Sequence, residues 1–187
     1  MRLDLATGWV EGVEHCPSDN CNERPGGEIS LLVIHNISLP PGQFGTGQVQ
    51  RFFQNRLEVD AHPFFQEIAG LKVSAHFLVE RDGRITQFVA CHGRAWHAGV
   101  SQFQGREGCN DYSIGIELEG TDFEPFDDRQ YRALTQLSRL LLQAYPAIGR
   151  ERICGHSDIA PGRKTDPGPA FDWSRFLASL EPCGRAE

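Results

Sequence analysis

The stretch SLLVIHNI, residues 30–37, decides the fold, because it is apolar at nearly every position from Leu31 to Ile37. A run of this length and composition is typical of a strand that is covered on both faces of a sheet. We therefore expect a central strand here. His35 lies near its end, where a strand would hold an imidazole rigidly. From position alone, His35 is as consistent with a hydrogen-bonded core histidine as with a metal ligand.

Further strands are predicted along the chain. Residues 75–80 and 84–89 flank RDG at 81–83, and an Asp-Gly turn between two apolar runs predicts a hairpin. Residues 152–155 predict a short strand. The segment YSIGIELEG, residues 112–120, alternates along a strand, so that two sets of side chains face opposite ways: Ile114, Ile116 and Leu118, and Gly115, Glu117 and Glu119. The first face is expected to join the core, and the second to meet something polar.

Helices are predicted between and after these strands. A short helix at 48–55 follows the Gly- and Pro-rich loop 38–47. Asp127 with Gln130 forms a capping-box pattern before a long amphipathic helix, and residues 172–180 predict a terminal helix. Strands interleaved with helices predict an α/β (α+β) domain, in which helices flank a mixed central β-sheet.

Length and composition bound the function. The chain has 187 residues, 40% of them apolar and 23% charged, which predicts one domain over residues 1–187 with a short polar tail after about residue 180. The net charge of −7 argues against nucleic acid as a partner. Asp4 interrupts the place where a signal peptide would be apolar, and no long apolar segment follows. We expect a cytoplasmic protein that does not bind membranes and acts as a monomer.

The six cysteines are dispersed without a CxxC pair. This pattern favours free thiols in a reducing compartment over a disulfide framework. A structural zinc site built from His15, Cys16 and Cys21 is an alternative, although it lacks the usual short-spaced pairs.

The segment GHSDIAPGRKTDPGP, residues 155–169, places His156, Lys164 and Asp166 in a stretch that we expect to be a loop, too rich in Gly and Pro for a helix. Together with His35, it supplies two imidazoles and a carboxylate. This is the protein half of a catalytic zinc site with a fourth position open for water. A non-haem iron site using His156 and Asp158 is a less favoured alternative, because no further histidine follows His156.

Two other residue types point to hydrolysis. A carboxylate on the polar face of strand 112–120 is positioned to take a proton from a water beside a metal, and Glu117 and Glu119 satisfy this equally well. The Lys164 ammonium, two residues before Asp166, is positioned to stabilise an oxyanion. The sequence contains no Gly-x-Ser-x-Gly elbow, no P-loop and no Gly-x-Gly-x-x-Gly motif.

Five blocks, in this order, closely resemble the cytoplasmic AmpD-type N-acetylmuramoyl-L-alanine amidases: LVIHNISLPPG (32–42), VSAHFLV (73–79), RAWHAGVS (94–101), NDYSIGIELEG (110–120) and GHSDIAPGRKTDPGPAFDW (155–173). The resemblance covers nearly the whole chain, and five ordered blocks are far more specific than any one motif. It implies a peptidoglycan-recognition-like amidase fold and a zinc enzyme. Its substrates would be 1,6-anhydro-N-acetylmuramoyl peptides, hydrolysed during cell-wall recycling in a Gram-negative bacterium.

Motif positions imply the role of each residue. His35, His156 and Asp166 match the zinc ligands of the family, Glu117 its general base, and Lys164 the residue that stabilises the transition state. Other members of the wider family place a tyrosine where this chain has Ala75, so Glu117 is expected to act here instead. The substrate groove is expected to include Trp96, His97 and Asn36, although simple packing accounts equally well for Trp96 and His97.

Two other classes of protein remain as alternatives. A non-catalytic peptidoglycan-recognition module would bind muropeptide without cutting it. A zinc-stapled interaction domain would unfold on chelation and leave no open coordination position. The joint presence of three metal ligands, a base and a cation favours the enzyme.

Overall fold

The computed structural model describes residues 1–181, so Cys183 and the predicted tail beyond residue 181 lie outside the described part. The strands are β1 (Arg2–Leu3), β2 (Val10–Glu11), β3 (Glu14–His15), β4 (Cys21–Glu23), β5 (Leu31–Ile37), β6 (Phe77–Val79), β7 (Ile85–Gln87), β8 (Gly93–Ala95), β9 (Gln102–Phe103), β10 (Arg106–Glu107), β11 (Ser113–Glu119) and β12 (Ile153–Gly155). The α-helices are α1 (Gln48–Phe53), α2 (Pro63–Glu67), α3 (Asp128–Ala144), α4 (His156–Ile159) and α5 (Trp173–Ser179). The 3-10 turns are η1 (Pro25–Gly27), η2 (Val59–Ala61), η3 (Cys109–Asp111) and η4 (Arg150–Arg152).

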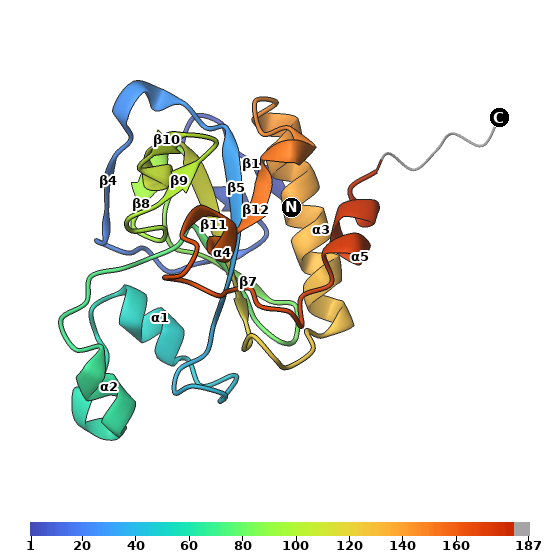
Figure 1. Cartoon of the computed structure of the whole chain (residues 1–187). Coiled ribbons are helices and arrows are strands. Elements are labelled where there is room, and N and C mark those ends of the chain that lie inside the picture. Colours follow the sequence, from blue (N-terminus) through green and yellow to red (C-terminus); the bar gives the residue numbers. More distant parts are fainter. Residues whose placement is uncertain (182–187) are drawn as a thin grey trace.

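Six strands form the predicted mixed sheet, in the order β12-β5-β11-β6-β7-β3 (Figure 1). β5 is a central strand with parallel β11 and β12 on either side, as its apolar run predicts. β6 and β7 form the predicted antiparallel hairpin. The register pairs His35 with Glu117 and Ile34 with Gly155. Three neighbouring parallel strands therefore bring His35, Glu117 and the start of the His156 segment to the same level of the sheet.

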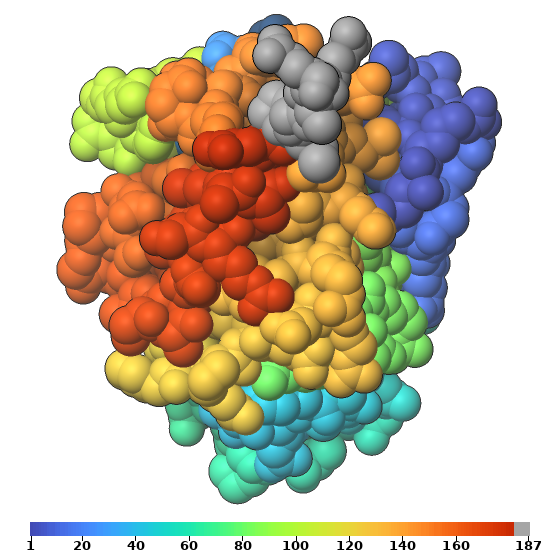
Figure 2. All heavy atoms as spheres, turned by 90° about the vertical axis from the view of Figure 1, so that its right-hand side faces the viewer, coloured from blue at the N-terminus to red at the C-terminus, as the bar shows by residue number. Residues whose placement is uncertain are grey.

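Side chains on the two faces of the sheet enter different clusters. Leu32, Ile34 and the isoleucines of β11 pack with the leucines of α3 and with Phe176 of α5. Figure 1 shows α3 and α5 together on this side, and Figure 2 looks onto it, with α5 lying against α3. Leu31 and Val33 point to the other face and pack with Ala98 and Tyr112. His35 follows this alternation, so the candidate site lies on the face away from α3.

Helix boundaries follow local signals in most places. Asp127 caps α3, and its side chain and that of Gln130 form the predicted capping box. The interpretation of residues 155–169 as free of helix is wrong at its start, because His156–Ile159 form one helical turn. The Asp158 carboxylate accepts a hydrogen bond from the Gly155 N–H at 2.7 Å, which caps that turn, and the prolines begin only at Pro161.

Within residues 1–181, no helix is both long enough and apolar enough to span a membrane. The five cysteines of this part have free thiols, as predicted from their spacing.

A buried polar group lies next to His76, just before β6. Arg24 is 8% exposed, and its guanidinium donates to the backbone carbonyls of Asn110, Cys91, Gly93 and Ser113. Next to it, the Nδ1 of His76 accepts from the Gly115 N–H at 3.1 Å, and its Nε2 lies 3.2 Å from the Gly93 carbonyl oxygen. These partners fit a neutral imidazole that carries its hydrogen on Nε2.

This environment predicts a pH-dependent stability. Burial, followed by the charge of Arg24, lowers the pKa of His76 from 6.5 to about 3. Between pH 6.5 and 3, His76 therefore binds a proton in the unfolded chain but not in the folded chain. The free energy of unfolding is highest above pH 6.5 and falls as the pH drops towards 3. We expect His76→Gln to flatten this fall by up to about 1.4 kcal/mol per pH unit. Urea unfolding at pH 7, 6, 5 and 4 measures it, and parallel curves for the two proteins would contradict it.

Candidate active site

Three side chains from distant parts of the chain converge at the carboxyl end of β5. His35 Nδ1 lies 3.0 Å from His156 Nδ1 and 3.0 Å from Asp166 Oδ2, and the remaining edge, from His156 Nδ1 to Asp166 Oδ2, is 3.1 Å. His35 and His156 are buried, whereas Asp166 is partly exposed. The predicted ligand set is therefore brought together with one donor atom from each residue facing a common centre.

This triangle fits a zinc ion. Bonds from zinc to nitrogen and oxygen are about 2.0–2.2 Å, so neighbouring corners of a tetrahedron around it lie roughly 3.3–3.5 Å apart. The observed edges are a few tenths of an ångström shorter, which a slight outward movement of the side chains corrects. Two imidazoles with one carboxylate are an ordinary zinc set, and three protein ligands leave a fourth corner free.

The electrostatics of the triangle favour a cation. Burial, as the largest cause, lowers the pKa of His35 from 6.5 to about 4, so its imidazole is neutral near pH 7 and keeps a lone pair. Burial acts to raise the pKa of Asp166, but its close contacts with the ring nitrogens of His156 and His35 outweigh burial and hold this pKa below its usual range. A charged carboxylate thus faces two imidazoles in a mostly buried place, where a divalent cation would balance it.

Glu117 lies on the same face of the sheet, on the strand next to His35. Its carboxylate is almost buried, and Oε2 has no hydrogen-bond partner among residues 1–181. Burial, followed by the negative charge of Asp166, raises the pKa of Glu117 well above its usual range, while the Lys164 ammonium lowers it. Leaving a buried carboxylate oxygen without a partner is costly, which makes Glu117 a candidate functional residue. Glu119 differs, because its two oxygens accept from the backbone N–H groups of Gly45 and Arg81.

Glu117, His156 and Asp166 open into one groove of about 540 Å³. Its polar lining includes Asn36, Glu117, His156, Lys164 and Asp166. Lys164 is exposed, and its positive charge lowers the pKa values of both Glu117 and His35. The apolar lining comes from the loop after β5, from the region of α1 and α2, and from Phe123, which is 82% exposed. A molecule with both polar and apolar surface can therefore lie over the candidate metal ligands.

The three residues expected at the substrate take different positions. Asn36 lines the groove, and its side chain donates to Asp122 Oδ1 at 2.7 Å and to the Pro167 carbonyl at 3.0 Å, which ties β5 to the site loop. His97 also lines the groove, but its Nδ1 lies 2.9 Å from His35 Nε2. Trp96 is half-buried, and its Nε1 donates to Asn22 Oδ1 at 2.7 Å. It is not among the described residues that line the groove. Substrate contact by these residues stays a prediction.

The alternative metal sites are not assembled. Asp158 caps the turn of α4 through the Gly155 N–H, which leaves Asp166 as the carboxylate beside His156. His15 Nε2 lies 2.8 Å from the Val10 carbonyl oxygen. In the described part of the chain, the single group of three candidate ligands within mutual reach is His35, His156 and Asp166.

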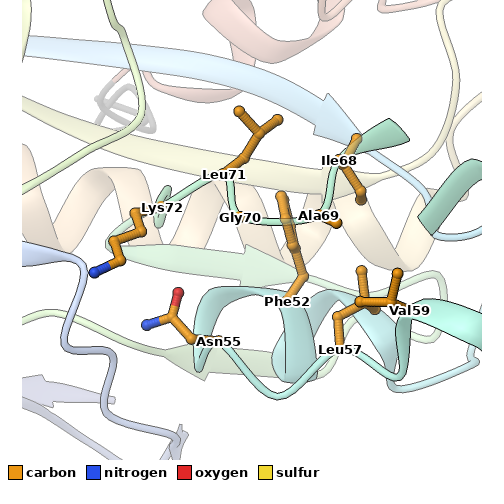
Figure 3. A pocket seen from close by; sticks show the side chains of 9 residues that line it. All are labelled: Phe52, Asn55, Leu57, Val59, Ile68, Ala69, Gly70, Leu71 and Lys72. Atoms are coloured by element: carbon orange, nitrogen blue, oxygen red, sulfur yellow. The ribbon is translucent and has the colours of Figure 1, made fainter. Parts of the chain in front are cut away.

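Sequence reasoning missed the apolar wall of the groove. A smaller hollow adjoins it on the side of α1, and Figure 3 shows Phe52 and Leu57 near the turn that carries Ile68 and Leu71. Phe52, Ile68 and Leu71 line both spaces. Leu71 is 53% exposed, and an exposed leucine is common enough on any surface to give no signal before the fold is known.

Comparison with known proteins finds relatives along nearly the whole chain. Residues 25–169 match the family described as N-acetylmuramoyl-L-alanine amidase. The chain is 56% identical over 177 residues to the 1,6-anhydro-N-acetylmuramyl-L-alanine amidase AmpD of Enterobacter cloacae, with 94% of each covered. The crystal structure of a selenomethionine AmpD derivative is similar with a TM-score of 0.93 at 52% identity, covering 97% of this chain and 100% of that one. AmpDH3 of Pseudomonas aeruginosa, crystallised with anhydromuramic pentapeptide, has a TM-score of 0.63 at 32% identity, covering 83% and 61%.

Proposed function

Because the chain belongs to the N-acetylmuramoyl-L-alanine amidase family, we propose that it is a zinc-dependent enzyme that cuts anhydromuropeptides in cell-wall recycling. The bond hydrolysed joins the lactyl carbonyl of 1,6-anhydro-N-acetylmuramic acid to the nitrogen of L-alanine. One observation carries the proposal: the donor atoms of His35, His156 and Asp166 converge beside a groove that is also lined by Glu117, whose Oε2 has no hydrogen-bond partner among residues 1–181.

Each of these residues, together with Lys164, would have a separate role in the hydrolysis. His35, His156 and Asp166 would hold zinc, which supplies Lewis acidity by lowering the pKa of a water and polarising the carbonyl. Glu117 accepts a proton from the attacking water and returns it to the alanine nitrogen as the C–N bond breaks. The Lys164 ammonium stabilises negative charge on the carbonyl oxygen. Water is consumed, and the products are the anhydromuramic carboxylic acid and the free peptide.

We also propose that the reaction takes place in the cytoplasm. The free thiols of the five described cysteines suit a reducing compartment. The proposed substrate class rests on the relatives: those named AmpD are, by name, 1,6-anhydro-N-acetylmuramyl-L-alanine amidases, and AmpDH3 was crystallised with an anhydromuramic pentapeptide.

The role of Lys164 can be tested cleanly, because the chain contains only two lysines, Lys72 and Lys164. We expect Lys164→Met to lower kcat by about 10²-fold, since it removes a charged group that acts on developing negative charge. Zinc content should stay unchanged, because Lys164 is not among the donor atoms. Lys72→Met is the matched control, with kcat expected near the wild-type value. Equal kcat for Lys164→Met and the wild type would remove Lys164 from the mechanism.

Product analysis tests the proposed reaction. Purified protein is incubated with anhydromuramic pentapeptide alone, with chelator, and with chelator followed by zinc. We expect mass spectrometry to show anhydro-N-acetylmuramic acid and intact pentapeptide in the first and third samples only. Binding of the muropeptide without turnover in every sample would instead favour the non-catalytic recognition module.

A further inference from the structure

The two imidazoles of the metal site are held from behind by one short segment, His97-Ala98. Each imidazole points Nδ1 into the donor triangle and Nε2 away from it. His35 Nε2 lies 2.9 Å from His97 Nδ1, and His156 Nε2 lies 3.1 Å from the Ala98 carbonyl oxygen. Two consecutive residues therefore contact the rear nitrogens of both metal-binding histidines.

The contact with Ala98 fixes the hydrogen of His156. A carbonyl oxygen can only accept a hydrogen bond, and it lies closer to His156 Nε2, at 3.1 Å, than the Arg163 guanidinium does, at 3.4 Å. The shorter contact places the bonding hydrogen on His156 Nε2. In the neutral ring, Nδ1 then carries the lone pair that a metal ion requires. The Arg163 guanidinium donates to the same oxygen at 2.6 Å, and also to the Val100 carbonyl at 2.6 Å, which anchors this carbonyl in place.

The hydrogen of His35 is fixed through a longer chain. The Ser113 hydroxyl donates its one hydrogen to the Cys109 carbonyl at 2.6 Å, so its oxygen accepts from His97 Nε2–H at 3.1 Å. His97 Nδ1 is then an acceptor and receives the hydrogen of His35 Nε2. With its hydrogen at the rear, His35 presents a bare Nδ1 to the donor triangle. Reversing the chain would put a hydrogen on that atom and block metal binding.

The support is itself held in position by two features of the fold. The Asn110 side-chain oxygen accepts from the backbone N–H of His97 at 3.1 Å and from that of Ala98 at 2.8 Å. A Cβ on Gly115 would lie 2.6 Å from the His97 ring. Because a glycine weakens the middle of a strand, its presence in β11 is explained by the space that the ring needs.

We propose that His97, with Ser113 behind it, is a positioning residue that sets the metal-binding tautomer of His35, while the Ala98 carbonyl does the same for His156. This inference rests on the proposed zinc site. It explains why the rings of both His35 and His156 present Nδ1, and not Nε2, to the metal. Loss of a hydrogen bond behind a metal-bound histidine typically costs about 10–100-fold in metal affinity.

The test measures zinc affinity by competition with a chromophoric chelator at neutral pH. His97→Leu removes the acceptor and should weaken zinc binding about 10–100-fold, and Ser113→Ala should weaken it as well, by up to about 10-fold. His97→Asn restores an acceptor near Nδ1 and should recover most of the affinity. His76→Gln, which alters a neighbouring buried histidine with no hydrogen bond to a ligand, is the matched control and should bind zinc like the wild type.

A second readout separates positioning from folding. Nitrogen NMR of the metal-free protein should show His35 with its hydrogen on Nε2 in the wild type, and a mixture of tautomers in His97→Leu. Unchanged zinc affinity and an unchanged tautomer in folded His97→Leu would overturn the inference and leave the zinc site intact. Failure of the wild type itself to bind zinc would overturn the proposed function instead.

Discussion

Glu117→Gln is expected to lower kcat by about 10²–10⁴-fold while zinc content remains at the wild-type level. Glutamine has nearly the shape of glutamate but cannot accept a proton from water. Glu117 lies next to His35 in the sheet register and is not one of the three converging donor residues. Removing its charge therefore removes the base and leaves the ligand set in place. Steady-state kinetics with anhydromuramic pentapeptide and metal analysis of the same preparation measure both effects.

Glu119→Gln provides the matched control, two residues along the same strand and on the same face. The Glu119 oxygens are occupied by the backbone N–H groups of Gly45 and Arg81, so we expect a loss of stability with kcat per folded molecule within a few-fold of the wild type. A Glu117→Gln protein that retains full kcat would show that some other group takes the proton. Equal losses in the two variants would show that the effect is one of folding.

Asp166→Ala is expected to abolish both activity and tight zinc binding. The carboxylate is the negatively charged member of the triangle and contacts both imidazoles, at 3.0 Å and 3.1 Å. Without it, two neutral nitrogens remain, and two ligands hold zinc far more weakly than three. We expect zinc affinity to fall by more than about 10²-fold, which is more than the loss of a hydrogen bond behind a ligand costs. Chelator competition and kinetics with added zinc measure the two losses.

Asp122→Asn is the control for Asp166→Ala, because it shows whether changing any acidic residue of the groove weakens zinc binding. Asp122 lines the groove and accepts a hydrogen bond from Asn36, but it is not one of the three converging donors. We expect this variant to keep the zinc affinity of the wild type. Wild-type zinc affinity in Asp166→Ala would mean that the ion binds elsewhere.

Much of the fold follows from patterns within single segments. The apolar run at β5, the alternation along β11 and the capping box of α3 each carry their own signal, and each predicted element is present. The helical turn of α4 could not be foreseen, because a single capped turn needs only four residues free of proline, and the prolines begin at Pro161. The Gly and Pro content of the whole segment 155–169 predicts a loop and gives no sign of so short a helix within it.

The candidate site could be predicted only in part. Residue type and motif single out His35, His156 and Asp166, and the sheet register places His35 beside the start of the His156 segment. The role of His97 behind His35 could not be deduced, because it depends on which way the Ser113 hydroxyl donates and on the space above Gly115. These are tertiary contacts between β11 and a loop, and no local pattern encodes them.

Anomalous diffraction at the zinc absorption edge tests the central claim most directly. Crystals of the protein grown with one equivalent of zinc should show one strong peak in the centre of the triangle. We expect it about 2.0–2.2 Å from His35 Nδ1, His156 Nδ1 and Asp166 Oδ2. A peak at any other group of side chains, or none at full zinc occupancy in solution, would contradict the account.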